Sequence, residues 1–416
     1  MDLKELVALN RSGTPQALPS FCTANAYVLD DLLGFAASHN LPVLIEATCN
    51  QVNQFGGYTG LTPATHAANI RQKAHAAGLA ANQLILGGDH LGPNPWKHLP
   101  AADAMERALA LVKAYVEAGF TKIHLDASMP CGGEPVPCFE QVAERSAELC
   151  AVAEAHAPDP RLLSYVIGTE VPVPGGEADD MAGIAVTTPA RLAATIDTHK
   201  IAFAGRGVPQ GIDRAIAVVV QPGVDFSHDS IYHYDRDKVA GLAQAIGQYD
   251  GLAFEAHSTD YQATDSLAAL VADHSVILKV GPEITFRFRE GIMALDQIEA
   301  LLDLPDPARA MEAVVRAMQD APSDWSNYYQ GTPEAIRILQ LFSYSDRIRY
   351  YWDMPTVSEA LRKLIANLTL AGLPAAIAAQ FGADFPIRAD SVDPRSLVTQ
   401  RVTTTAERYY RACGWL

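Results

Sequence analysis

Eight short apolar runs recur along the first two thirds of the chain, and each is followed by a polar cluster and a stretch with helical periodicity. This alternation is the pattern of repeated strand–helix units. The runs are continuously apolar, as is typical of parallel strands that are covered on both sides. They comprise residues 20–23, 43–45, 84–86, 122–125, 165–167, 217–220, 252–254 and 276–279.

The number of runs favours a closed (β/α)₈ (TIM) barrel over an open doubly wound sheet, which usually carries a G-x-G-x-x-G turn that is missing here. The stretch 101–118 predicts one of the helices, since its apolar residues share one face and it follows Pro100. After about residue 300 the strand pattern stops, and 332–342 and 357–372 are predicted as helices. We therefore expect an α/β fold with a TIM barrel over residues 1–300 and a mostly helical C-terminal appendage, residues 301–416, packed on the barrel.

Composition excludes several classes of protein. The chain has 416 residues, 49% of them hydrophobic, and a formal charge of −17, which opposes binding to nucleic acid. No apolar run reaches the ~18 residues of a membrane span, and the N-terminus lacks a secretory signal. The six cysteines include no C-x-x-C pair and are expected to be reduced. We expect a cytoplasmic, oligomeric protein with no membrane or nucleic-acid partner.

Polar residues gather where the predicted strands end, and in a TIM barrel this end carries the reacting groups. These residues should converge on one cup of the size of a small ligand. The alternative is that they only cap strands and helix starts. The set comprises Glu46, Asn50 and Gln54 after the second run, Asp89 and His90 after the third, Asp126 after the fourth, Glu170 after the fifth, Gln221 after the sixth, Glu255 and His257 after the seventh, and Lys279 in the eighth.

Some of these residues suggest a metal site. A carboxylate directly after an apolar strand, such as Glu170, loses water and needs a partner, for which a metal or a sugar hydroxyl would serve. Imidazole is a common ligand of divalent metals, so His90, Glu170 and His257 are candidate ligands, with Gln221 or water in a fourth position. The histidines at positions 66, 98, 156 and 274 fall in helical stretches and are expected at the surface.

Other segments lack a clear chemical role. Residues 54–60 and 171–176 are rich in glycine or proline and are expected to be shaped loops over the barrel mouth, although plain connections are the alternative. The aromatic and Arg-rich stretch 344–352 either closes over the barrel mouth, meets a partner or packs within the appendage. The chain has neither a P-loop nor a G-x-S-x-G elbow, which disfavours P-loop phosphoryl transfer and serine hydrolysis.

Several segments together resemble the accessory, non-catalytic Z-type (GatZ/KbaZ) subunit family of D-tagatose-1,6-bisphosphate aldolase. They are residues 45–60, 87–93, 167–176, 254–262, 278–282 and 344–352. The resemblance implies a barrel related to class II aldolases that supports the activity and stability of a separate catalytic subunit in galactitol, tagatose and amino-sugar catabolism. Similar proteins have been described as metal-dependent ketohexose 4-epimerases. Others carry a tagatose-6-phosphate kinase label, which the missing P-loop does not support.

The resemblance also assigns roles to residues. Asp89 and His90 match an acid/base aspartate and a zinc-binding histidine of class II aldolases, and His257 matches another ligand. Gln221 stands where the aldolases have a further histidine, and the Gly-Gly-Ser-Gly turn after the seventh-strand histidine is absent. The segment from Lys279 to Pro282 replaces their Asn-x-Asp phosphate turn. These departures argue against independent cleavage of a bisphosphorylated sugar.

Two hypotheses follow. The first is an accessory subunit that binds a class II tagatose-bisphosphate aldolase catalytic subunit. The second is a 4-epimerase that acts on tagatose, fructose or their phosphates by retro-aldol cleavage and re-addition, with a divalent metal, zinc foremost. For it, the candidate catalytic residues are Asp89, Glu46 and Asp126, the metal ligands are His90, Glu170, Gln221 and His257, and the sugar-binding residues are Asn50, Gln54, Glu255 and Lys279.

Overall fold

The computed structural model describes residues 2–169, 184–382 and 391–416. Its centre is a closed barrel of eight parallel strands, so the predicted TIM barrel is confirmed. Each strand contains or overlaps one of the eight apolar runs. The strands are β1 (Leu18–Cys22), β2 (Val43–Thr48), β3 (Leu84–Leu91), β4 (Lys122–Leu125), β5 (Ser164–Ile167), β6 (Ala215–Val220), β9 (Ala253–Ala256) and β10 (Ser275–Val280).

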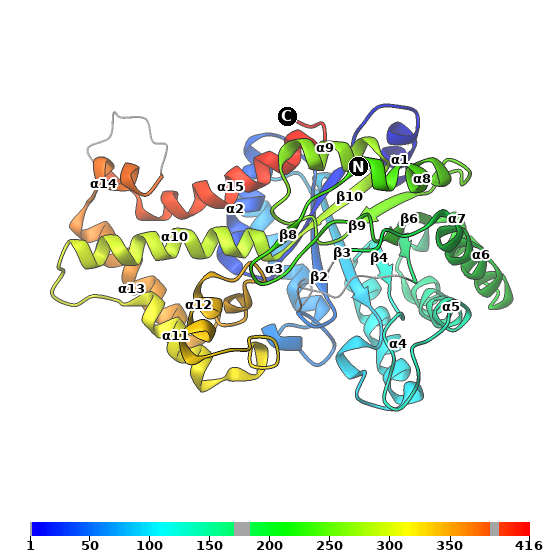
Figure 1. The fold of residues 1–416 in the computed structure, drawn as a ribbon, viewed down its shortest axis with the longest axis horizontal. Coiled ribbons are helices and arrows are strands. Elements are labelled where there is room, and N and C mark those ends of the chain that lie inside the picture. Colours follow the sequence, from blue (N-terminus) through cyan, green and yellow to red (C-terminus); the bar gives the residue numbers. More distant parts are fainter. Residues whose placement is uncertain (1, 170–183, 383–390) are drawn as a thin grey trace.

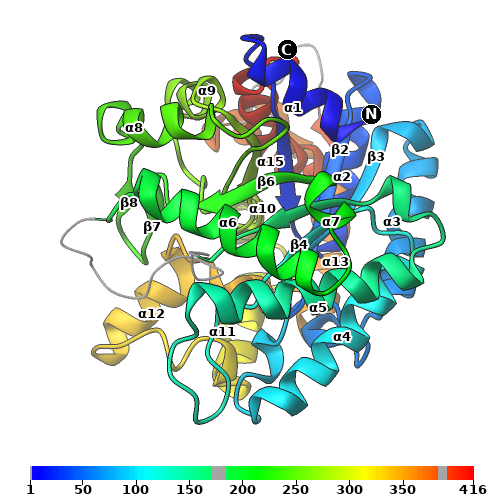
Figure 2. The same ribbon diagram turned by 90° about the vertical axis from the view of Figure 1, so that its right-hand side faces the viewer.

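Helices cover the outside of the barrel, and α4, α5 and α6 lie side by side along it (Figure 2). Helix α4 shows why: Met105, Ala108, Leu111, Val112 and Tyr115 are buried on one face, as their spacing predicts. The helices of this part are α1 (Leu3–Arg11), α2 (Ala26–Ser38), α3 (Pro63–Ala76), α4 (Ala101–Glu117), α5 (Phe139–His156), α6 (Pro189–Gly205), α7 (Gln210–Asp213), α8 (Arg236–Ile246), α9 (Thr264–Ala272) and α10 (Pro282–Leu301).

Several helices begin with the same local signal, a Thr or Asp cap followed by proline. The cap side chain accepts a hydrogen bond from a free backbone N–H of the first turn, and proline needs no such partner. The cap residues are Thr62 of α3, Thr188 of α6, Thr332 of α12 (Pro333–Phe342) and Asp393 of α15 (Pro394–Ala412).

The amino end of the barrel is closed by α1. Its residues Leu3, Leu6 and Val7 share an apolar cluster with Leu18 and Leu44, which belong to β1 and β2. Burial of this apolar surface closes the amino end of the barrel against water. The carboxyl ends of the strands are therefore the end at which a ligand can enter the barrel.

The chain after α10 forms a helical extension beside the barrel (Figure 1). It comprises α11 (Ala310–Asp320), α12, the short helix η6 (Arg347–Tyr350), α13 (Pro355–Ala371), α14 (Ala375–Gln380) and α15. The extension also contains a two-stranded sheet of β11 (Leu373–Pro374) and β12 (Ser391–Val392). A second two-stranded sheet, β7 (Asp225–Phe226) with β8 (Ile231–Tyr232), follows β6 of the barrel. In the described part of the chain, no helix has the length and apolar character needed to cross a membrane.

The last helix, α15, returns to the barrel and packs against α2, α9 and α10. Tyr409 donates a hydrogen bond to Thr259 O at 2.7 Å, and Tyr410 donates one to Pro42 O at 2.7 Å. A Cβ at Gly291 of α10 would lie 2.9 Å from Val398 Cα, so the approach of α10 to α15 depends on glycine. The division at residue 300 stays a prediction, but its C-terminal part contributes a helix to the ring around the barrel.

Candidate functional site

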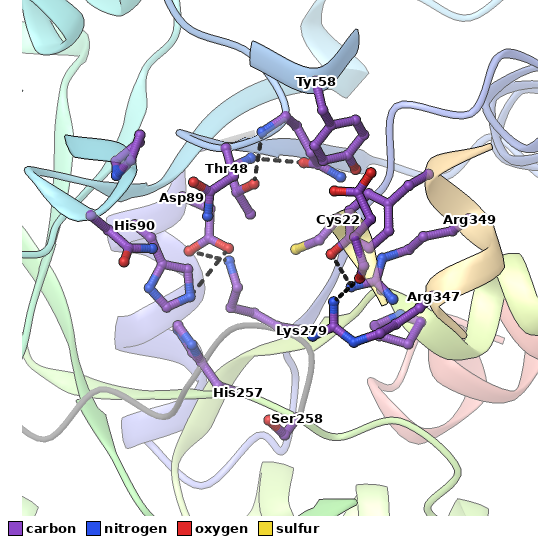
Figure 3. A pocket seen from close by; sticks show the side chains of 18 of the residues that line it. Cys22, Thr48, Tyr58, Asp89, His90, His257, Ser258, Lys279, Arg347 and Arg349 are labelled. Carbon is purple, nitrogen blue, oxygen red and sulfur yellow. Dashed lines mark hydrogen bonds and ion pairs between the residues drawn. The ribbon is translucent and has the colours of Figure 1, made fainter. Parts of the chain in front are cut away.

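A cavity of about 440 Å³ opens at the carboxyl ends of the barrel strands. Asp89, His90 and His257 lie on one side of it, and Arg347 and Arg349 lie on the opposite side (Figure 3). The first group comes from barrel strands and the segments directly after them, and the second group comes from η6. The ends of the barrel strands and the C-terminal extension therefore line one cavity together.

A bulge in β3 points two successive residues toward this cavity. In a regular strand Asp89 and His90 would face opposite sides, but the pairing of β3 with β4 shifts between Gly88 and Leu91. His90 has a φ of 49°, in the left-handed region that only a few non-glycine residues adopt. Both side chains consequently line the cavity.

Three histidine rings meet at the floor of the cavity. The ring centroids of His90, His124 and His257 lie 5.0–5.2 Å from one another. His90 Nδ1 lies 2.8 Å from Asp126 Oδ2, and His124 Nδ1 lies 3.0 Å from Asp89 Oδ1. Each of these carboxylates therefore fixes the orientation of one ring.

A buried network of acids and lysines lies directly against this cluster. Lys122 Nζ is 2.9 Å from Glu46 and 2.6 Å from Glu255, and none of these three side chains is exposed. Lys279 Nζ is 3.0 Å from Glu46 and 2.8 Å from Asp89. A Cβ at Gly87 would lie 2.6 Å from Glu46 Cγ, so glycine at this position leaves room for the carboxylate. The lysines compensate charges that burial would otherwise make very unfavourable.

The pKa values of the buried groups follow from these contacts. Burial raises the pKa of Asp89 and Glu255, but the positive charges of His90 and Lys279 beside Asp89, and of Lys122 beside Glu255, hold both carboxyls well below their ordinary values. The same acids raise the pKa of Lys279 against the effect of its burial. Burial lowers the pKa of His257 to about 3, so this imidazole is neutral.

The donor set fits a divalent metal. Ligand atoms of Asp89, His124, Glu255 and His257 all lie within 4.8 Å of one another, and the four residues are buried. The Nε2 atom of His124 is buried with no hydrogen-bond partner among the described residues. Four carboxylates, those of Glu46, Asp89, Asp126 and Glu255, outnumber the cations beside them, which are Lys122, Lys279 and the His90 imidazole, so a metal ion here would balance excess negative charge. Two imidazoles with carboxylates are a typical zinc-binding set.

The structure brings together most of the residues predicted from the sequence. The residues Asp89, His90, His257, Lys279 and Asn50 line the cavity. Asp126 contacts His90, and Glu46 and Glu255 lie in the network behind the cavity floor. All of these assignments to catalysis or binding stay predictions.

Two predicted residues lie away from the cavity. The Gln54 side chain donates a hydrogen bond to Arg107 O at 3.0 Å, and the carboxamide oxygen of Gln221 accepts one from Gly223 N at 2.8 Å. Neither residue lines the cavity. Glu170 and the loop 171–176 lie outside the described residues.

Sequence reasoning missed several residues of the site. Lys122 and His124 were included in the fourth apolar run, and no role was assigned to them. A signal was present, because residues two apart in a strand face the same side, and these two polar residues share the inward face with no apolar residue between them on that side. Arg347, Arg349 and Tyr350 belong to the stretch 344–352, which the structure places at the cavity wall.

The expectation for the remaining histidines was partly wrong. His98 and His156 are exposed, and His274 is half-buried in a turn. His66, however, is buried on the inner face of α3 with 1% of its surface exposed. His66 lies on the same face of α3 as the buried residues Ala67 and Ile70, so its neutral ring packs with them against the barrel.

Barrel and cavity define the chain as a (β/α)₈ protein with a buried histidine–carboxylate site at the carboxyl ends of its strands. A family profile described as "D-tagatose-1,6-bisphosphate aldolase subunit GatZ/KbaZ-like" matches residues 3–414. The chain belongs to this family.

Individual relatives agree with the family. The chain is 45% identical to the D-tagatose-1,6-bisphosphate aldolase subunit GatZ of Klebsiella pneumoniae and 43% identical to that of Salmonella typhimurium, with 99% of each chain covered in both cases. It is also similar to a crystal structure described as a probable tagatose 6 phosphate kinase from Sinorhizobium meliloti 1021. That likeness has a TM-score of 0.87 and 41% identity, and it covers 96% of this chain and 100% of the other.

Proposed function

We propose that this chain is an accessory, non-catalytic subunit of a D-tagatose-1,6-bisphosphate aldolase, which supports the activity and stability of a class II catalytic subunit. The observation that carries the proposal is the match along nearly the whole chain to proteins named as subunits of that aldolase, at 43–45% identity. Binding to a folded partner stabilises that partner by mass action. We place the complex in the cytoplasm and expect it to be oligomeric.

Co-expression with the catalytic subunit of such an aldolase tests this proposal. An affinity tag on the present chain should retain the catalytic subunit through gel filtration, and the catalytic subunit should lose activity faster on heating without its partner. An unrelated TIM-barrel protein with the same tag is the control. A catalytic subunit that neither copurifies nor gains heat stability refutes the accessory role.

A second candidate function is a metal-dependent ketohexose 4-epimerase, which the histidine–carboxylate group at the cavity floor favours. A metal held by His124, Glu255 and His257 would supply polarisation of sugar oxygens and leave the Asp89 carboxylate for proton transfer. Asp89 is positioned to take a proton from a sugar hydroxyl and return it. His90 and Lys279, whose Nζ lies 2.8 Å from Asp89, hold the pKa of that carboxyl well below its usual range, so Asp89 is ionised in the free site.

Metal analysis of the purified chain, combined with incubation with tagatose, fructose and their phosphates, tests the epimerase. Stoichiometric metal with interconversion of the ketoses supports it, and His124→Ala and His257→Ala should then lose metal and turnover. His98→Ala removes an exposed histidine and is the matched control. If the chain binds no metal and converts no ketose, the epimerase is excluded.

A further inference from the structure

The helix η6 is held over the barrel mouth by contacts of the residues directly before it. Tyr261, which follows β9, donates a hydrogen bond to Tyr344 O at 2.6 Å. Asp346, directly before η6, is buried between Thr285 Oγ1 at 2.6 Å and Arg289 Nε at 3.2 Å. These bonds fix the position of the next residues relative to α10 and the strand ends. Arg347, Arg349 and Tyr350 of this helix form part of the cavity wall.

Arg347 is a buried cation that lacks an anionic partner. Only 5% of its surface is exposed, and its Nε atom has no hydrogen-bond partner in the described structure. Its Nη1 donates to the backbone O of Asp324 at 2.6 Å, and its Cζ lies 3.1 Å from the ring centroid of Tyr328. Burial lowers the pKa of Arg347, which shows that desolvation outweighs the favourable charges around it. A buried guanidinium in this state is stabilised by an incoming anion.

Arg349 presents a second guanidinium on the same wall. Its Nη1 donates to the backbone O atoms of Ser345 and Asp346, and its Nη2 donates to Tyr350 Oη at 2.7 Å. The Cζ atoms of Arg349 and Arg347 lie 4.4 and 6.0 Å from the ring centroid of Tyr350. Among the described residues, no ion pair joins either arginine to a carboxylate.

Two further acids line the cavity. Asp324 lies on the same wall, but Arg347 donates to its backbone O, and no ion pair joins its carboxylate to either arginine in the described structure. Asp260 lines the cavity too, and burial raises its pKa to about 7 although two backbone N–H groups donate to it. The cavity therefore has a basic wall at η6. Its opposite side carries Asp89 and His257, which belong to the histidine–carboxylate group (Figure 3).

We infer that Arg347 and Arg349 bind the phosphate group of a phosphorylated ketose, whose carbonyl and hydroxyl end points to Asp89 and the histidine cluster. Guanidinium groups pair with phosphate through two parallel hydrogen bonds, which makes arginine well suited to this group. A cavity of about 440 Å³ accommodates a sugar phosphate. The inference rests on the proposed function in one respect, namely that the ligand is a ketose. It gives the extension after α10 a role in ligand binding.

Calorimetric titration of the full-length chain tests the inference. Tagatose 6-phosphate should bind the unmodified chain about tenfold or more tightly than tagatose, and its affinity should fall as sodium chloride is raised. Arg347→Gln should reduce this difference about tenfold while the weak binding of tagatose stays unchanged. Inorganic phosphate should compete with the sugar phosphate for the unmodified chain.

Three controls keep the test decisive. Arg316→Gln removes an exposed arginine of α11 and should bind both sugars as the unmodified chain does. Arg347→Lys keeps the charge without the planar guanidinium, and it should fall between the unmodified chain and Arg347→Gln. Circular dichroism shows whether each variant is folded, and the comparison of the two sugars on the unmodified chain needs no variant.

The outcomes separate this inference from the proposed function. Equal affinity of the unmodified chain for tagatose and tagatose 6-phosphate overturns the inference, as does a folded Arg347→Gln variant with undiminished preference for the phosphate. In both cases, copurification with an aldolase subunit still supports the accessory role. Selective binding of tagatose 6-phosphate without complex formation refutes the accessory role and leaves the phosphate site standing.

Discussion

Buried charges are paired with opposite charges behind the cavity floor, but not at the wall formed by η6. In the network behind the floor, Lys122 and Lys279 each contact two or more carboxylates, and all of these groups come from barrel strands. At the wall, Arg347 and Arg349 donate to backbone carbonyl groups and stack on aromatic rings, with no carboxylate paired to them among the described residues. Paired charges stabilise the barrel, whereas cations without an anion are available to a ligand. This contrast locates ligand binding at the boundary between barrel and extension.

The largest effect is expected from breaking the floor network. Lys122→Met leaves Glu46 and Glu255 without the ammonium that lies within 2.9 Å of both, and we expect a loss of about 3–5 kcal/mol in the free energy of unfolding. Urea denaturation measures this loss. Lys113→Met is the control, because the exposed Lys113–Glu117 pair contributes about 0.5 kcal/mol or less. Equal midpoints for the two variants would contradict a stabilising role for the floor network.

A smaller effect is expected from His66, a buried group that belongs to neither region. Burial lowers its pKa to about 4, below the ordinary value of 6.5, and its Nε2 has no partner in the described structure. The unfolded chain binds this proton first, so the stability that the neutral ring contributes is present above pH 6.5 and is lost as the pH falls toward 4. The contribution is about 3 kcal/mol from the size of the pKa shift.

His66→Gln removes this titration, and its free energy of unfolding should therefore fall less steeply between pH 6.5 and 4 than that of the unmodified chain. Denaturation at a series of pH values measures the two slopes. The control is His98→Gln, since His98 is exposed. Identical slopes for His66→Gln and the unmodified chain would show that His66 does not titrate in this range.

The smallest expected effect is a loss of Zn²⁺ affinity, which distinguishes a metal site that includes His124 from one that includes Gln221. His124→Ala should weaken binding of Zn²⁺ about tenfold or more, because the orphaned Nε2 atom of His124 lies in the histidine–carboxylate group. Gln221→Ala should change Zn²⁺ affinity about twofold or less, since the Gln221 carboxamide accepts from Gly223 N. Equilibrium dialysis with Zn²⁺ measures both. The reverse order of effects would restore Gln221 as the ligand suggested by the aldolase resemblance.

The barrel was predictable because its strands are continuous apolar runs, and a run of this kind is visible without knowledge of its neighbours. Asp89, His90 and His257 were predictable for the same reason, since the end of a parallel strand fixes the end of the barrel to which its residues belong. His124 was not, because it lies inside a strand, where a polar residue gains its role from the side chains opposite it.

Other features depend on contacts between distant segments. The place of α15 between α9 and α2 follows from how its buried residues fit those helices, which no local pattern specifies. The role of Arg347 and Arg349 depends on Asp346, whose bonds to Thr285 and Arg289 fix η6 over the mouth. An Arg-rich stretch alone is compatible with a partner surface, a cavity wall or simple packing.

The most direct test of the accessory role is the rate at which a purified class II catalytic subunit cleaves D-tagatose 1,6-bisphosphate while the present chain is added in increasing amounts. The account predicts no cleavage by this chain alone, and an activity or heat stability of the catalytic subunit that rises to a plateau at a fixed ratio of the two chains. Cleavage by this chain alone, or a catalytic subunit whose activity and heat stability do not respond to it, would contradict the account.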